Sequence, residues 1–393
     1  MSFFLLPRTY LFIYKHIEYK EKVEEIPHYS PSLTDYLYRI KEKITAKEKH
    51  WDSYKKYTNP YEYIHTSVPL KKKSVSKYKP LSRSFFKMVE IITTFRIQYK
   101  EPIRTFQLAE GPGGFIEAMV FLRNNAEDQY IGITLLDIDK NDHNIPAWKK
   151  SEAFLKANPN VLLENGADKT GNLLSVENFE YVVSKYINTK MDLVTGDGGF
   201  DFSMDSNQQE QMIGQLLFAQ MAYALCLNKK GGNFILKIFD CFMPHTVDVL
   251  YILSSFYDKV YIMKPNTSRY ANSEKYIICL GFLYDNHTSF YPYLLSCFQK
   301  MCENPDGLTG RLLNIDISQL FYRRIEEYNA IFGQKQIQNI MFTLSLIENK
   351  NKIDKIENLL QTNIQKSMDW CNRFHIPFHS LNIPANIFLV GEP

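Results

Sequence analysis

The chain has 393 residues, of which 45% are hydrophobic and 23% are charged, and its formal net charge at pH 7 is +3. This composition is that of a globular protein and excludes a disordered chain. The length is sufficient for one large α/β domain with extensions, or for two domains. Because the net charge is small, the overall field of the protein cannot carry nucleic-acid binding, and any RNA contact has to depend on a local basic patch.

The cysteines and the apolar segments restrict the cellular setting. The six cysteines, at positions 226, 241, 279, 297, 302 and 371, form no C-x-x-C pair. We therefore expect neither a zinc site nor a disulfide framework, and a reducing, intracellular compartment. No apolar run approaches the length of a membrane span, so no membrane contact is predicted. Residues 1–14 are apolar, but Pro7 and Arg8 interrupt them and no cleavage site follows, so we do not interpret them as a signal peptide.

The N-terminal third begins with a segment rich in Tyr, Lys and Glu. Helical patches such as residues 34–49 predict a helical N-terminal extension over residues 1–66. A basic cluster follows at residues 71–79, which is as typical of a solvated loop as of a phosphate contact, although its position just before the α/β core favours RNA. Residues 82–92 form an amphipathic helix, and Lys87 lies within it among apolar neighbours.

Strands and helices alternate from residue 103 onward. Strands are expected at 103–109, 129–135, 161–164, 191–195, 233–239, 259–263 and 274–283, with helices at 115–123, 176–186, about 206–228 and 246–257. The last two strands are joined by a loop without a crossover helix, which predicts an antiparallel last pair on an otherwise parallel sheet. We infer an α/β protein with a Rossmann-like, doubly wound sheet and one reversed edge strand, over residues 67–290. Residues 291–393 form a helical C-terminal extension for packing or partner contacts, of which packing is the safer interpretation.

A glycine-rich turn is the most informative stretch of the chain. Residues 106–115 read as the end of a strand, an acid (Glu110), the turn Gly-Pro-Gly-Gly, and the start of a helix. Such a turn lets a ligand approach the backbone, the helix N-terminus suits an anionic group, and the acid suits ribose hydroxyls. The spacing is not the dinucleotide one; an acid before a compact Gly-x-Gly-Gly turn is the form used for S-adenosyl-L-methionine (SAM). On the turn alone, a tight βα turn without a ligand is an equally good interpretation.

Four polar residues stand out against their surroundings: Lys87, Asp197, Lys237 and Glu274. Asp197 follows a strand, Lys237 lies inside an apolar strand, and Glu274 begins the last strand. The carboxyl ends of parallel strands face one crevice, and an antiparallel strand that enters from that edge brings Glu274 there as well. Each residue alone has an ordinary explanation, as a snorkelling lysine, a helix cap or a loop salt bridge, but four accidents in one crevice are much less plausible.

Five segments together resemble a known family. Residues 82–88, 108–115, 192–200, 231–240 and 264–276 are similar, in this order, to the FtsJ-like (RrmJ-type) ribose 2′-O-methyltransferases, and most similar to the cap-specific mRNA (nucleoside-2′-O-)-methyltransferases of eukaryotes and their viruses. The resemblance covers roughly residues 82–283. It implies a Rossmann-like, SAM-dependent methyltransferase fold and a catalytic tetrad of Lys87, Asp197, Lys237 and Glu274.

The resemblance also implies binding residues. The cofactor positions carry over to Glu110, Gly111, Pro112, Gly113, Gly114, Phe115, Asp168, Asn172, Leu173 and Asp197. The cap enzymes usually have Asp where this chain has Asn172, whose side-chain oxygen can still accept from the adenine amino group, and Asp168 is a nearby substitute. Substrate contacts carry over to Asn207 and Asn272, and Arg269 in the same loop is either a phosphate contact or an ordinary surface arginine.

The expected chemistry is methylation of a ribose 2′-hydroxyl in RNA, with Lys237 as the general base. Lys87 and the SAM sulfonium would lower the pKa of Lys237, whereas the carboxylates of Asp197 and Glu274 would raise it. The sequence therefore does not predict whether the pKa of Lys237 is raised or lowered. Asp197 would orient Lys237, and Glu274 would balance Lys87 and hold the hydroxyl; no metal is required.

The preferred substrate is the first transcribed nucleotide or nucleotides of 5′-capped mRNA. The alternatives are the same chemistry on internal rRNA or tRNA riboses, and a non-catalytic RNA-binding protein on a methyltransferase fold. A partner protein from the capping machinery is also expected, and the location would be the nucleus, or the cytoplasm or a virus factory if the protein is viral.

Overall fold

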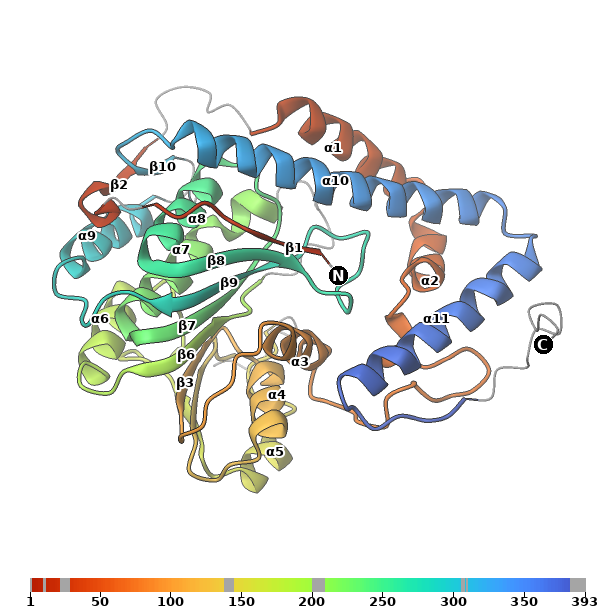
Figure 1. Ribbon diagram of the computed structural model, residues 1–393, viewed down its shortest axis with the longest axis horizontal. Coiled ribbons are helices and arrows are strands. Elements are labelled where there is room, and N and C mark those ends of the chain that lie inside the picture. Colours follow the sequence, from red (N-terminus) through yellow and green to blue (C-terminus); the bar gives the residue numbers. More distant parts are fainter. Residues whose placement is uncertain are drawn as a thin grey trace.

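The computed structural model describes residues 2–9, 12–21, 29–137, 145–199, 209–304, 308 and 310–381. Within these residues an eight-stranded sheet runs through the protein (Figure 1). In spatial order its strands are β1 (Ser2–Leu5), β8 (Tyr257–Lys264), β9 (Lys275–Phe282), β7 (Asn228–Ile238), β6 (Met191–Gly196), β3 (Arg104–Leu108), β4 (Gln129–Ile133) and β5 (Val161–Glu164).

The sheet is mostly parallel, which confirms the predicted fold class. Strands β7, β6, β3, β4 and β5 run parallel to one another, and β9 is antiparallel to both of its neighbours, β7 and β8. The last strand, β9, is reversed as predicted, but it lies inside the sheet, and the edge next to β8 is formed by β1. The run Tyr-Ile-Ile-Cys-Leu in β9 explains this position, since a continuous apolar run is typical of a strand that is covered on both faces.

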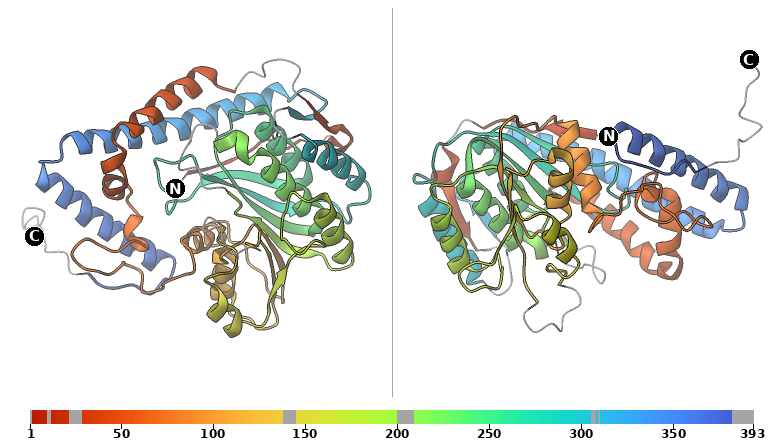
Figure 2. Two further views of the ribbon diagram at one scale, coloured as in Figure 1. Left: turned by 180° about the vertical axis from the view of Figure 1, so that it is seen from behind. Right: turned by 90° about the horizontal axis from the view of Figure 1, so that it is seen from below.

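Helices cover both faces of the sheet (Figures 1 and 2). One face carries α6 (Val176–Lys185), α7 (Gln209–Leu227), α8 (Pro244–Phe256) and α9 (Tyr291–Cys302), and the other carries α3 (Ser84–Thr94) and α4 (Gly114–Arg123), with α5 (Glu152–Ala157) at its margin. The alternation of side chains along β7 fits this arrangement, because Phe234 and Leu236 belong to one hydrophobic core and Ile235 to the other.

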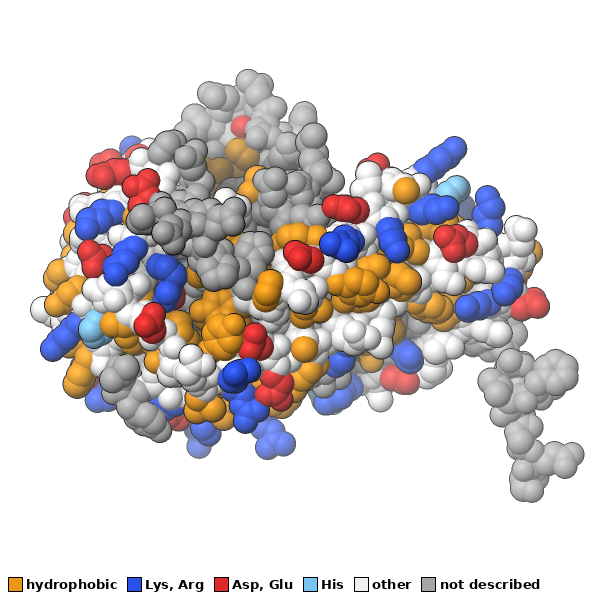
Figure 3. Space-filling model, turned by 90° about the horizontal axis from the view of Figure 1, so that it is seen from above, with side chains coloured by type: hydrophobic (Ala, Val, Ile, Leu, Met, Phe, Trp, Pro, Cys, Tyr) orange, Lys and Arg blue, Asp and Glu red, His pale blue; other side chains and the backbone are white. Residues whose placement is uncertain are grey.

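The N- and C-terminal extensions pack against each other and not as separate units. Their helices are α1 (Pro31–Thr45), α2 (Glu48–Thr58), α10 (Gln319–Glu348) and α11 (Ile353–Arg373), with the short η2 (Glu62–Ile64) against α11. Figure 2 shows these helices as one arm beside the sheet. On the face that carries α1 and α10, acidic and basic side chains are interspersed over the described part of the surface (Figure 3). No described helix is long and apolar enough to cross a membrane.

Two segments outside residues 67–290 belong to the α/β body. Strand β1 pairs with β8 and forms the edge of the sheet, so the N-terminal extension is not only helical as predicted. A second small sheet joins β2 (Ile17–Lys20), which follows the 3-10 helix η1 (Ile13–His16), to β10 (Arg311–Leu313). Helix α9 buries Leu294 and Phe298 in the same core as α7. Strands β1 and β2 were not predicted, because each is short and pairs with a strand far away in the chain.

Candidate active site

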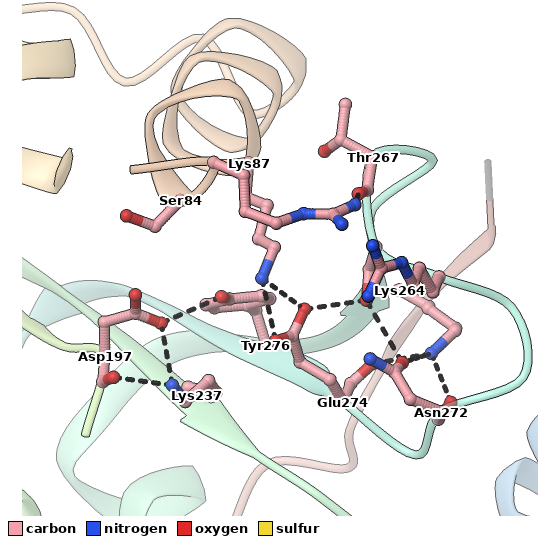
Figure 4. A network of polar contacts seen from close by, with 12 residues as sticks. Ser84, Lys87, Asp197, Lys237, Lys264, Thr267, Asn272, Glu274 and Tyr276 are labelled. Carbon is pink, nitrogen blue, oxygen red and sulfur yellow. Dashed lines mark hydrogen bonds and ion pairs between the residues drawn. The ribbon is translucent and has the colours of Figure 1, made fainter. Parts of the chain in front are cut away.

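The four polar residues predicted to form a tetrad lie together at one edge of the sheet (Figure 4). Asp197 follows β6, Lys237 lies near the end of β7, Glu274 immediately precedes the antiparallel β9, and Lys87 reaches them from α3. Each side chain is largely buried. They form two lysine–carboxylate pairs.

The first pair joins Lys237 to Asp197. The Lys237 Nζ atom donates to the backbone oxygen of Asp197 at 2.6 Å and lies 3.3 Å from its Oδ1 atom. The hydroxyl of Tyr276, which lies opposite Lys237 in the β7–β9 register, donates to the same Oδ1 atom at 2.9 Å. Burial and the neighbouring Asp197 raise the pKa of Tyr276, so this hydroxyl stays protonated and holds the carboxylate in place.

The second pair joins Lys87 to Glu274. The Lys87 Nζ atom lies 2.7 Å from Glu274 Oε1 and 2.8 Å from Oε2, and the Ser268 hydroxyl donates to Oε1 at 2.7 Å. Burial lowers the pKa of Lys87, although Glu274 and Asp197 oppose this effect. Burial alone would raise the pKa of Glu274, but Lys87 and Lys237 hold it well below its ordinary value. Glu274 is therefore ionised at neutral pH.

The loop between β8 and β9 is fastened to the helix that carries Lys87. Glu90 on α3 accepts from the backbone N–H groups of Asn266 (2.8 Å) and Thr267 (3.1 Å), and from Trp370 Nε1 of α11 at 3.3 Å. At the foot of the loop, Lys264 Nζ donates to the backbone oxygen of Glu274 at 2.9 Å. The C-terminal extension thus contacts the residues that position the tetrad.

The N-terminal extension holds the same loop through Glu62. Both oxygens of this fully buried carboxylate accept from Arg269, at 2.7 and 3.0 Å, and Arg83 Nη1 lies 3.7 Å away. Arg83 also donates to the backbone oxygen of Thr267 at 3.1 Å. Burial would raise the pKa of Glu62, but the two arginines lower it to about 2. Arg269 is therefore engaged in an internal ion pair, and its contact with an RNA phosphate stays a prediction.

A cavity of about 570 Å³ borders the tetrad, which is a size typical of small-molecule sites. Lys87, Asp197 and Lys237 lie on one side of it. The remaining wall comes from loops at the carboxyl ends of the parallel strands: Ala109, Gly111, Pro112, Thr134, Leu135, Ile145, Pro146, Gly171, Asn172, Leu173, Leu174 and Gly199, with Ser82, Arg83, Ser84 and Leu216. An elongated ligand in this cavity would reach from the glycine turn to the tetrad.

The glycines are needed because these loops pack tightly. A Cβ atom on Gly111 would lie 2.5 Å from the backbone oxygen of Ala147, and one on Gly171, which has a φ of +69°, would lie 1.9 Å from the backbone oxygen of Thr134. No other residue fits at these positions without a shift of backbone. Gly113 and Gly114 begin α4 against Leu81, Ser82 and Ser84, and Phe115 is fully buried behind them.

Eight of the ten predicted cofactor residues fall into two groups in the structure. Gly111, Pro112, Asn172, Leu173 and Asp197 line the cavity, whereas Gly113, Gly114 and Phe115 shape the turn behind it. The Oδ1 atom of Asn172 already accepts from the backbone N–H of Leu174 at 3.0 Å.

Glu110 faces the helix that follows it. Its Oε1 atom accepts from the backbone N–H groups of Phe115 (2.8 Å) and Ile116 (2.9 Å), and burial raises its pKa to about 8. A helix start leaves such N–H groups without partners inside the helix, which explains why the acid turns toward them and not toward the cavity. In this arrangement Glu110 does not line the cavity, so its expected contact with a ribose stays a prediction.

The remaining predicted contacts also have internal partners. The exposed Asp168 accepts from Thr170 N (2.8 Å) and Asn178 Nδ2 (2.9 Å), and does not line the cavity. The Asn272 Oδ1 atom accepts from Lys264 Nζ at 3.0 Å. Asn207 lies outside the described residues. In the basic cluster, Lys71, Lys72 and Lys73 are exposed, so their contact with RNA stays a prediction.

Sequence reasoning missed several residues that complete the site. Tyr276 had a usable signal, because residues two apart on a strand share a face and Glu274 was already assigned. Ser268 lies in a segment that was recognised only as a whole. Glu62 and Glu90 gave no signal, since a single glutamate in a helical segment is ordinary until its long-range partners are known.

The sheet order, the glycine turn after the first parallel strand and the cavity at the carboxyl ends define a Rossmann-like α/β protein of the kind that binds a nucleotide cofactor. A model of the FtsJ-like methyltransferase family matches residues 80–282. The chain belongs to this family, which confirms the resemblance recognised in the sequence. Among the described residues, no three His, Cys, Asp or Glu side chains are grouped to hold a metal ion.

Known proteins are similar over the same region. The cap-specific mRNA (nucleoside-2′-O-)-methyltransferase 1 of Trypanosoma cruzi (strain CL Brener) is 35% identical over 243 residues, which are 61% of this chain and 64% of that protein. The protein of the same name from Dictyostelium discoideum is 33% identical over 300 residues, covering 72% of this chain and 39% of that protein. The chain thus spans less than two thirds of the length of these relatives.

Two further similarities are weaker. A Caenorhabditis briggsae protein named inactive cap-specific mRNA (nucleoside-2′-O-)-methyltransferase 1B is 28% identical over 263 residues, covering 64% of this chain and 30% of that protein. A solved structure described as a putative ribosomal RNA methyltransferase from Plasmodium falciparum has 19% sequence identity and a TM-score of 0.38, and covers 52% of this chain and 98% of that chain.

Proposed function

We propose that this protein transfers a methyl group from SAM to the ribose 2′-hydroxyl of the first transcribed nucleotide or nucleotides of 5′-capped mRNA. The observation that carries the proposal is the pair of buried lysine–carboxylate contacts, Lys237–Asp197 and Lys87–Glu274, on the border of one cavity. The names of its relatives support the choice of a capped mRNA, because these proteins are similar to 61% and 72% of this chain.

The cavity suits SAM as the methyl donor. Its wall begins at Gly111 and Pro112, where backbone can approach the ligand closely, and continues to the amide of Asn172 and the apolar Leu135 and Leu173, which suit a nucleobase. When bound, SAM supplies an electrophilic methyl group on a sulfonium. Asp197, Lys87 and Lys237 lie at the other side of the same cavity, where the methyl acceptor would be held.

The geometry around Lys237 fits a general base. A neutral amine has two N–H bonds and one lone pair, and Asp197 offers two acceptors, its backbone oxygen and its Oδ1 atom. With both N–H bonds directed at Asp197, the lone pair of Lys237 is left for the proton of the ribose hydroxyl. A positioned general base contributes about 10²–10⁴-fold to a rate, and the correct placement of the hydroxyl contributes at least a comparable factor.

Lys87 and Glu274 would act on the hydroxyl from the other side. Glu274 is ionised and accepts from Lys87 and Ser268, so it can orient the substrate without competing for the proton. Lys87 is the positive partner of Glu274, with its Nζ atom 2.7 Å from Glu274 Oε1. The pair would be held in register by the loop contacts of Glu62 and Glu90.

The two alternatives remain distinct proposals. Methylation of an internal rRNA or tRNA ribose would use the same tetrad, and only the RNA substrate separates it from the preferred function. The Caenorhabditis briggsae relative is named as inactive, but the connected tetrad of this chain argues against a non-catalytic RNA-binding role. A capping-machinery partner protein and an intracellular location, in the nucleus or the cytoplasm, also stay predictions.

The test is transfer of labelled methyl from SAM to a short RNA with an N7-methylguanosine cap, beside the same RNA without the cap. Label on the capped RNA alone, mapped to the first ribose, is the expected result. Label on both RNAs would favour an internal ribose as the substrate over the first transcribed nucleotide of a capped mRNA. No label on either, with SAM binding intact, would overturn catalysis by the chain alone. The Lys237→Met variant serves as the control for background transfer.

A further inference from the structure

A second cavity, of about 470 Å³, lies between the C-terminal extension and the end of β8. Lys264, Asn266 and Tyr270 form one side, and Phe332, Lys335 and Phe342 of α10 form the other. The residues of α10 lie outside the segment that the methyltransferase family shares, which ends at residue 282. The second cavity is therefore a feature that the extension adds to the α/β body.

The second cavity carries a surplus of positive charge. The part of its wall that the structure describes has two lysines and no Asp or Glu. Lys264 Nζ donates only to neutral oxygens, at 2.7 to 3.0 Å. These are the backbone oxygens of Asn272 and Glu274 and the Oδ1 atom of Asn272. Burial and the nearby Lys275 lower the pKa of Lys264 to about 7. An anion in the cavity would relieve this repulsion.

Both basic and acidic side chains lie behind the wall. Lys41 and Lys275 share one buried carboxylate, Asp240, at 3.2 and 3.7 Å. The next acid, Glu210, has its pKa raised to about 7 by burial, so it carries only part of a negative charge at neutral pH. The described wall itself, with two lysines and no carboxylate, favours a phosphate over a positively charged ligand.

The rest of the wall has the chemistry of a nucleobase site. Tyr270, Phe332 and Phe342 offer aromatic rings for stacking, and the carboxamides of Asn266, Gln338 and Asn339 offer donors and acceptors for a base edge. Asn339 already donates to the backbone oxygen of Thr58 at 2.9 Å, which fixes its orientation. Rings, carboxamides and lysines on one wall match a nucleotide, which combines a planar base with a phosphate.

The second cavity is joined to the tetrad. Lys264 lies in its wall and holds the backbone of Glu274, and Figure 4 shows Lys264 and Asn272 beside Glu274. A smaller hollow of about 150 Å³ shares Tyr270 and Asn339 with it and contains Asn272 and Arg269. An RNA chain whose ribose is at the tetrad therefore has a neighbouring place for another of its nucleotides.

We propose that the second cavity binds a nucleotide of the RNA chain other than the one that is methylated. The proposal rests on the proposed function in taking RNA as the substrate. The composition of the wall favours a chain nucleotide over the cap, because N7-methylguanine is itself a cation and the described wall offers lysines and no carboxylate.

The experiment measures equilibrium binding of fluorescein-labelled RNA to the full chain, without methyl transfer. Two ligands are compared, a cap dinucleotide and a capped RNA of about ten nucleotides. Phe342→Ala and Lys335→Glu should each weaken the longer RNA roughly tenfold or more and leave the dinucleotide unchanged, since loss of one base stack or phosphate contact has about this effect.

Matched variants lie on the same helix. Met341→Ala changes an exposed neighbour outside the second cavity, and Arg323→Glu reverses an exposed charge in the same way as Lys335→Glu. Both should bind the longer RNA like the unchanged protein, and thermal melting with SAM binding confirms the fold of each variant. An equal loss for both ligands would assign the second cavity to the cap and overturn the proposal, as would no loss for either. RNA that binds as expected without being methylated would contradict the proposed function alone.

Discussion

Glu62 and Arg269 form a two-point ion pair between the N-terminal extension and the loop that precedes Glu274. The carboxylate is fully buried, and about a third of the arginine side chain is exposed to solvent. Glu62 also neutralises Arg83, which immediately precedes α3, the helix that carries Lys87. The same carboxylate therefore holds the loop and α3 at a fixed separation. The geometry of the tetrad thus depends on a residue outside the family segment.

Replacing Glu62 by Gln should destabilise the protein and slow methyl transfer. The change removes the negative charge and leaves two arginines without an acidic partner, which should lower the free energy of unfolding by about 2–3 kcal/mol, less than for a fully buried pair because Arg269 is partly exposed. Urea unfolding measures this loss. The exposed Glu48→Gln on α2 is the matched control, and an equal effect of both changes would contradict the role of Glu62.

Replacing Lys237 by Met should abolish the general base and keep the cofactor site. We expect the rate of methyl transfer to fall by about 10²–10⁴-fold with the affinity for SAM unchanged. Single-turnover kinetics and calorimetric SAM binding give the two quantities. A variant that still transfers methyl at the normal rate would remove Lys237 from the mechanism.

Replacing Tyr276 by Phe should test the support of Asp197. The hydroxyl makes one hydrogen bond to the carboxylate, at 2.9 Å, and the ring is fully buried. Loss of a hydrogen bond to a charged group costs about 1.5–3 kcal/mol, so a rate decrease of roughly tenfold or more is expected if the loss falls on the transition state. The KM for RNA should change little, since Tyr276 does not line the cavity. A change in KM alone would contradict this assignment.

Glu110 should give the protein a measurable pH dependence of stability. Its pKa of about 8 in the folded state lies above that of an unfolded chain, about 4.3. The folded state therefore binds the proton more tightly, and the contribution of Glu110 is largest at low pH and declines as pH rises toward 8. The slope is at most about 1.4 kcal/mol per pH unit.

Glu110→Gln removes this titration and keeps an oxygen for the N–H groups of Phe115 and Ile116. Chemical unfolding at several pH values between 5 and 8 should show a shallower decline for the variant than for the unchanged protein. Glu110→Ala also removes the cap and should cost about 1 kcal/mol more. Parallel pH profiles for Gln and Glu at this position would show that the carboxyl does not titrate there.

The sequence predicts the parts of this protein that depend on local pattern. The parallel strands and the tetrad follow from apolar runs that end in polar residues, because the ends of parallel strands must meet. The sequence does not predict the hydrogen-bond partners of Glu110 and Arg269. Glu110 accepts from the start of a helix, and Arg269 donates to a glutamate 207 positions away in the chain. The second cavity could not be predicted from the sequence, because no sequence pattern shows that α10 lies beside the end of β8.

Strand β1 has a consequence for the synthesis of the protein. Leu5 pairs with Tyr261, and the backbone oxygen of Leu5 accepts from Tyr328 of α10 at 2.7 Å. At about 5–20 residues per second, the ribosome needs roughly 13–50 s to make the residues between β1 and its partner. Strand β1 therefore leaves the ribosome well before the strand with which it pairs. Until β8 has been made, β1 exposes unpaired backbone groups to other nascent chains.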